Sequence, residues 1–160
     1  MRKTIVLMIM VLVPAAVFAQ TAGPVQSVSI TLSSTQIASL RGTPVTLIAA
    51  PGPGKVISPI SLAAQYKVGT TPYAITSGGN LNFSLGPLGN SEIAFEPVGG
   101  SGFIDQTTNQ LNVRSGASIG DAQSKLENQD LRVTNDGSAE WAGGDGTVTI
   151  TITYTVVTLQ

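Results

Sequence analysis

The sequence predicts an all-β fold, a single antiparallel β-sandwich of jelly-roll type with about eight strands. Short apolar runs alternate with polar residues at a period of two, which is typical of strands with one buried face. Turn-forming Gly, Pro, Asn and Asp recur about every ten residues. Charged residues make up only 11% of the chain, and Thr, Ser, Gly and Asn carry its polarity. This composition favours strands and tight turns over charged surface helices.

The first predicted strand covers residues 28–32, where aliphatic residues alternate with Ser and Thr. Residues 34–40 break this alternation. Ile37 and Leu40 lie three positions apart, so we expect one helical turn there, capped by Ser34.

A second short strand is predicted over residues 44–50, followed by a rigid Pro-Gly-Pro-Gly turn at 51–54. The longest alternation before the C-terminus then runs over residues 56–68. Pro59 lies inside it and cannot donate to a ladder, which indicates an edge strand or a bulge at that point.

The middle of the chain is less regular, and its elements are predicted from shorter apolar patterns. We expect strands around residues 81–85, 93–98, 111–113 and 131–133, and one helical turn at 121–125. Asn-Asp-Gly at 135–137 is a strong reverse-turn signal after the last of these strands.

The final segment has the clearest strand pattern. Five apolar residues alternate with five threonines, namely Val148, Ile150, Ile152, Tyr154 and Val156 with Thr147, Thr149, Thr151, Thr153 and Thr155. No Lys, Pro or charge guards this segment as an edge. The strand is therefore either internal to a sheet or paired with another chain. For the second case, Thr147, Thr149, Thr151 and Thr153 are candidate partner contacts.

The N-terminus has the pattern of a secretory signal. Arg2 and Lys3 precede an apolar run at 5–13, and small residues end at Ala19. We expect cleavage after Ala19, a loose lead-in at 20–27 and a β-sandwich domain at 28–160. An uncleaved anchor is the alternative, but the apolar run is short for a permanent membrane span. The expected location is periplasmic or extracellular.

Composition excludes several functions for residues 20–160. This part has six basic and nine acidic residues, a net charge of −3, and no basic stripe of the kind that binds nucleic acid. The chain has no His and no Cys, which excludes a Ser-His-Asp triad and ordinary zinc, copper or haem sites. We expect no cofactor and no enzymatic activity; a carboxylate-based hydrolase is the weakest alternative.

Two groups of residues are candidate binding sites. Asp136, Glu140 and Asp145 could gather oxygens around calcium, although the Asp-x-Asp-x-Asp-Gly spacing is missing and tight turns use the same residue types. Tyr73 and Trp141 lie in Gly-rich loops and are candidate contacts with a partner. They support the alternative function, a secreted module that binds carbohydrate or mediates surface adhesion.

Several turn and strand motifs resemble those of a known class of proteins. They are Ser33-Ser34-Thr35-Gln36-Ile37, Thr43-Pro44-Val45-Thr46-Leu47-Ile48, Ala50-Pro51-Gly52-Pro53-Gly54-Lys55-Val56, Gly69-Thr70-Thr71-Pro72-Tyr73, Asn80-Leu81 and Gly143-Gly144-Asp145-Gly146-Thr147-Val148-Thr149-Ile150. With these motifs, most of residues 28–157 resembles small β-sandwich virion proteins of tailed bacteriophages and prophages, of the head-decoration or minor structural kind.

The resemblance implies a non-enzymatic structural module that assembles on a larger surface, often as a trimer, and it implies no catalytic residue. The chain departs from this class in one respect. Virion proteins assemble in the cytoplasm and normally lack an export leader, so the leader suggests a related fold used outside the inner membrane.

Overall fold

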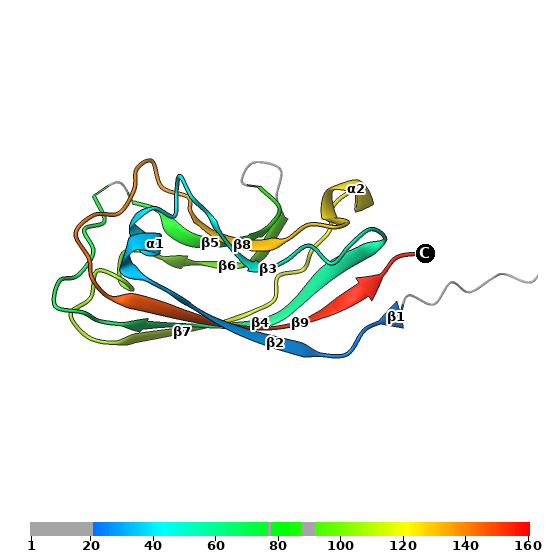
Figure 1. Ribbon diagram of the computed structural model, residues 1–160, viewed down its shortest axis with the longest axis horizontal. Coiled ribbons are helices and arrows are strands. Elements are labelled where there is room, and N and C mark those ends of the chain that lie inside the picture. Colours follow the sequence, from blue (N-terminus) through cyan, green and yellow to red (C-terminus); the bar gives the residue numbers. More distant parts are fainter. Residues whose placement is uncertain (1–20, 77, 88–91) are drawn as a thin grey trace, which may run out of the picture.

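The computed structural model describes residues 21–76, 78–87 and 92–160, which form two antiparallel sheets packed in two layers (Figure 1). The first sheet contains β1 (Thr21–Ala22), β2 (Gln26–Leu32), β9 (Thr147–Thr158), β4 (Lys55–Lys67) and β7 (Gln110–Ser115). The second contains β3 (Val45–Ile48), β8 (Leu131–Asn135), β5 (Asn80–Leu85) and β6 (Glu92–Gly99). Two short helices, α1 (Ser34–Ala38) and α2 (Gln123–Leu126), lie in the connections.

The order of the strands is that of a jelly roll. One sheet runs β2-β9-β4-β7 and the other β3-β8-β5-β6, so the chain crosses repeatedly between the two layers. The all-β, jelly-roll prediction is therefore confirmed. The two-residue strand β1, which pairs with the end of β9, accounts for a ninth strand among the described residues.

Strand β9 lies inside the first sheet. It pairs with β2 from Leu32 to Gln26 on one side and with β4 along nearly its whole length on the other. Its inward side chains Val148, Ile150 and Ile152 are at most 1% exposed. Of the two possibilities for this strand, the internal one is correct, and the expectation that its edge meets another chain is wrong.

Local chemistry explains several element boundaries. The α1 cap is Ser33 rather than Ser34: Ser33 Oγ accepts from the Gln36 amide, and the Gln36 side chain accepts from the Ser33 amide. Pro59 lies at a bulge, where the β4–β9 register shifts by one residue, as the sequence indicated. The sheet also begins earlier than residue 28, because β1 and the start of β2 lie within the expected lead-in.

The expected signal peptide lies outside the described residues, so its cleavage stays a prediction. In the part of the chain that is described, no helix has both the length and the apolar character needed to cross a membrane.

A cluster of aromatic side chains fills the core at the loop end of the sandwich. Tyr66 packs against Tyr73 and Phe103, with ring centroids 6.4 Å and 6.1 Å away. The Tyr73 hydroxyl donates to the Gly146 carbonyl at 2.8 Å. The backbone of Gly144 lies directly on the Tyr73 ring, and a Cβ there would collide with it. The Gly-Gly-Asp-Gly motif at residues 143–146 thus covers the buried rings with backbone atoms, and we call this segment the lid.

Asp145, within this motif, fastens the lid to the β4–β5 loop. Its carboxylate accepts from the Thr70 amide at 3.0 Å, the Thr70 hydroxyl at 2.5 Å and the Thr71 amide at 2.8 Å. These hydrogen bonds, led by the Thr70 side chain, lower the pKa of Asp145 to about 2.

Two other carboxylates bind loop backbone in the same way. Glu140 accepts from the amides of Arg41 at 2.9 Å and Gly42 at 2.6 Å. Asp136 accepts from the Asn80 amide at 2.7 Å and from its side-chain amide. A carboxylate can satisfy several loop N–H groups at once, which explains why acids recur in the turns of a weakly charged chain.

We predict that Asp145→Asn lowers the melting temperature at pH 7 and that this difference shrinks as the pH falls. Because the folded pKa lies below the ordinary 3.8, the carboxylate stabilises the fold above pH 3.8 and loses this contribution as the pH approaches 2. Thermal melts at pH 7, 4 and 2.5 measure it. Glu96→Gln, which removes a 3.6 Å ion pair between an exposed carboxylate and Arg114, should melt like the wild type at each pH.

We also predict that Gly144→Ala destabilises the fold by about 1–3 kcal/mol, because the added methyl must displace the Tyr73 ring in a packed core. Gly120→Ala is the matched control, since a Cβ at Gly120 meets open space. Urea titrations compare the two. Equal stability of both variants would contradict the close packing of the lid.

Candidate functional site

Part of the outer face of the first sheet is uncharged and carries mainly Ser and Thr side chains. The registers align three rows across β2, β9, β4 and β7: Thr31, Thr149, Gln65 and Leu111; Ser29, Thr151, Ala63 and Val113; and Ser27, Thr153, Ser61 and Ser115. We call these twelve positions the hydroxyl face. None of them carries a charge, and Lys67 lies one row beyond, opposite Thr147.

Hydroxyl pairs connect β2 to β9 across this face. Ser29 Oγ lies 3.1 Å from Thr151 Oγ1, and Thr31 Oγ1 lies 2.9 Å from Thr149 Oγ1. Thr151 and Thr149 are half-buried, as are Thr147 and Thr153. The candidate threonines therefore contribute to a face of the sheet and not to an edge, and their cross-strand pairs hold β2 in place.

Strand β7 has its polarity inverted. Its apolar residues Leu111 and Val113 point outward and are 67% and 62% exposed. Its polar residues Asn112 and Arg114 are only half-exposed, and Asn112 Oδ1 is buried with no hydrogen-bond partner. Leaving a Leu or Val in water instead of burying it forgoes about 1.5–3 kcal/mol each. The inversion leaves two aliphatic side chains exposed on the outer side of β7.

The sequence predicted a strand at Leu111 and Val113 but not their exposure. The usual reading of alternation places apolar residues inward. The sequence signal for this exposure lies at the alternate positions, which are the polar residues Gln110, Asn112 and Arg114. Polar side chains fit inward-facing positions only if they find hydrogen-bond partners there. Ile60, the extra residue of the β4 bulge, is a further exposed aliphatic residue at 43%.

Tyr73 and Trp141 lie in the core instead of at the surface. They are 2% and 1% exposed, and the Trp141 indole donates to the Gly78 carbonyl at 3.1 Å. Burial raises the pKa of the Tyr73 phenol well above its ordinary value. The expectation that these two rings are available to a partner is therefore wrong for the fold described here, and the carbohydrate-binding alternative loses its two aromatic candidates.

The three calcium candidates are not gathered into one site. Asp136, Glu140 and Asp145 each accept hydrogen bonds from a different loop backbone. Among the described residues, no three His, Cys, Asp or Glu side chains form a group that could hold a metal ion. The structure thus assigns these carboxylates to turns, which is the other reading that the sequence allowed.

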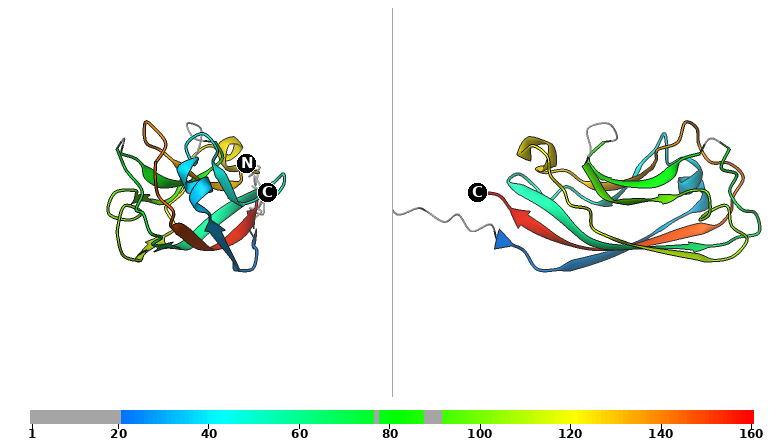
Figure 2. Two further views of the ribbon diagram at one scale, coloured as in Figure 1. Left: turned by 60° about the vertical axis from the view of Figure 1, so that its left-hand side comes forward. Right: turned by 180° about the vertical axis from the view of Figure 1, so that it is seen from behind.

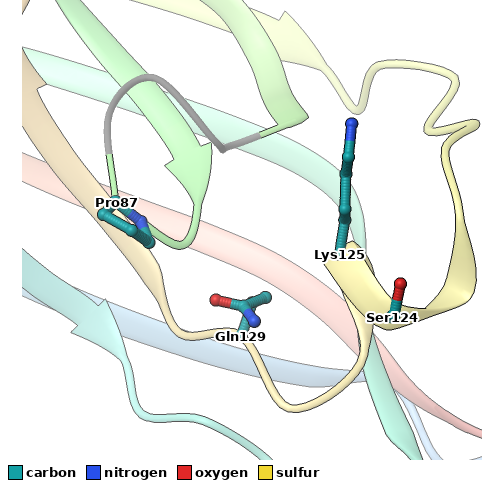
Figure 3. A pocket seen from close by; sticks show the side chains of 4 residues that line it. All are labelled: Pro87, Ser124, Lys125 and Gln129. Carbon is teal, nitrogen blue, oxygen red and sulfur yellow. The ribbon is translucent and has the colours of Figure 1, made fainter.

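Two pockets in the described part of the chain are small. The pocket drawn in Figure 3 has a volume of about 260 Å³ and lies between α2 and the ends of β5 and β8; its lining is Pro87, Ser124, Lys125 and Gln129. Another, of about 250 Å³, is mostly aliphatic and includes Ile119 and Leu159. Ser124 and Lys125 both line the first pocket, and the Lys125 ammonium donates to the Asp121 carboxylate at 2.9 Å.

Comparison with known proteins gives little similarity. No family model matches the chain, and no curated protein matches it in sequence. Among solved structures, a chain of the cyanophage Pam1 capsid asymmetric unit is similar with a TM-score of 0.43 and 13% identity, over 91% of this chain and 92% of that one. A TM-score below 0.5 does not establish a shared fold.

The burial of Trp141 predicts its fluorescence. It is the only tryptophan, so its emission should be blue-shifted, weakly quenched by acrylamide and unchanged by soluble oligosaccharides. Steady-state emission and quenching titrations measure this. Strong quenching by acrylamide, or a shift of the emission on adding a sugar, would show that Trp141 is exposed and would support the carbohydrate-binding alternative.

Proposed function

We propose that this chain is an exported, non-enzymatic structural module that acts by assembling with other copies into a larger protein structure. In this proposal it resembles the virion decoration proteins in role as well as in motifs. The hydroxyl face is the surface through which one subunit contacts the next.

The hydroxyl face carries this proposal. Three rows across four strands contain no charge, and Leu111 and Val113 remain exposed at one side of it. Protein interfaces differ from the remaining surface by having few charges at their centre. An uncharged sheet face with exposed aliphatic residues therefore suits contact with another protein surface better than contact with bulk water.

The residue inventory supports a non-enzymatic role. His and Cys are absent from the sequence. Asp136, Glu140 and Asp145, which could act as acids or bases, bind loop amides. For Asp145 these bonds hold the pKa near 2, far from the pKa near the working pH that a general acid or base needs.

Export rests on the sequence alone. The basic start, apolar core and small-residue exit of residues 1–19 are those of a secretory signal. An assembly module with this leader would act in the periplasm or outside the cell.

The double variant Leu111→Asp/Val113→Asp tests the assembly surface. Two carboxylates at the β7 side of the contact should weaken assembly by at least about thirtyfold, because they would have to be desolvated without partners. Sedimentation velocity at tens of micromolar measures the species present, and circular dichroism checks the fold.

Ile93→Asp is the control, since Ile93 is also an exposed aliphatic residue, at 46%, but lies on β6 of the other sheet. It should assemble like the wild type. A double variant that assembles normally would refute the role of the hydroxyl face.

A further inference from the structure

We propose that the free edge of β2 is a homodimer contact, where β2 pairs antiparallel with β2 of a second copy and extends the sheet across a twofold axis. The inference rests on the proposed function as an assembly module and names one of its contacts. In this proposal β2 is the strand that meets another chain, because β9 is internal to the sheet.

The other three sheet edges in the described residues carry protection against such pairing. Strand β3 has only four residues and an irregular register. Strand β6 contains Pro97 and the exposed Glu96. On β7, the Arg114 guanidinium donates to the Val113 carbonyl and places a charge on the strand. Short length, proline and charge are the usual means by which proteins block edge-to-edge association.

Strand β2 has none of these protections. Its seven residues, Gln-Ser-Val-Ser-Ile-Thr-Leu, include no charge and no proline, and β9 is its only partner strand among the described residues. Figure 1 shows β2 along the free border of the lower layer, and Figure 2 shows the same border from behind. The backbone groups on its outer side are therefore available to another strand.

The sequence of β2 is complementary to itself. In an antiparallel pair, residues directly opposite each other have their side chains on the same side of the sheet. A twofold axis between two copies of β2 must therefore lie between two copies of the same residue. The central residue of Gln26–Leu32 is Ser29. An axis there overlaps the whole strand, placing Val28 opposite the second copy's Ile30 and Ser27 opposite its Thr31.

This pairing continues contacts that β2 already makes. On the outer side, hydroxyl would face hydroxyl, as Ser29 and Thr31 face Thr151 and Thr149 of β9. On the inner side, Val28 and Ile30 are half-buried against the core, and the second copy would cover what remains exposed. With no charge on β2, the twofold axis brings no like charges together. These features favour a second copy as the occupant of this edge.

Charge substitution at Ser29 tests the contact, using the full chain as purified. Ser29→Lys and Ser29→Glu each place two like charges next to each other at the axis, so each variant should be monomeric at concentrations where the wild type associates. An equimolar mixture should re-form a dimer that contains one copy of each, because the charges are then opposite. Light scattering after size exclusion and native mass spectrometry measure mass and composition.

Ser118 supplies the matched control. It is an exposed serine that lies outside both β2 and the hydroxyl face. Ser118→Lys should dimerise like the wild type. Dimers of Ser29→Lys as stable as those of the wild type, loss of the dimer in Ser118→Lys, or a monomeric wild type at tens of micromolar would each overturn the inference.

Amide hydrogen exchange of the wild type gives a readout that requires no variant. The β2 amides should gain protection between micromolar and hundred-micromolar protein, whereas the amides of β6, in the other sheet, should not. If the chain associates and the β2 amides stay unchanged, the contact lies elsewhere.

The two proposals fail separately. If Leu111→Asp/Val113→Asp forms dimers but no larger species, both proposals stand. If the double variant abolishes every associated species while Ser29→Lys changes nothing, the β2 contact fails and the assembly function remains. If Ser29→Lys is monomeric and the double variant assembles like the wild type, the role of the hydroxyl face fails.

Discussion

The pairing of β9 on both of its sides is the constraint on which the rest of this structure depends. β9 joins β2 to β4 and contributes Val148, Ile150 and Ile152 to the core. Since side chains alternate strictly along a strand, burying these three residues forces the intervening threonines to the opposite side. The apolar core and the uncharged outer face are therefore two results of one pattern.

The loops depend on a second use of polar side chains. Asp136, Glu140 and Asp145 bind backbone amides that the tight turns leave without partners. Glycine at position 144 lets this backbone lie on the Tyr73 ring. The carboxylates that are candidate calcium ligands or catalytic groups by sequence thus connect the loops at this end of the sandwich.

The assembly that we propose rests on how this surface differs from that of an ordinary soluble domain. An exposed sheet face normally carries charges, and an exposed sheet edge normally carries a guard against pairing. The hydroxyl face carries no charges, and β2 has no charge or proline to block pairing at its edge. The two features lie on the same sheet, so a dimer formed at β2 would present a hydroxyl face twice as wide for further contacts.

The sequence by itself determined the strands, most of the turns and the two-layer fold, because period-two alternation and turn residues are local signals. It also indicated an edge strand or a bulge at Pro59, and it left β9 as either internal or paired with another chain. Only the tertiary structure decided that β9 is internal, that Tyr73 and Trp141 are buried, and that Leu111 and Val113 point outward. Alternation shows that a strand has two different faces, but which face is covered, and which edge is free, depends on the neighbours that distant parts of the chain bring to it.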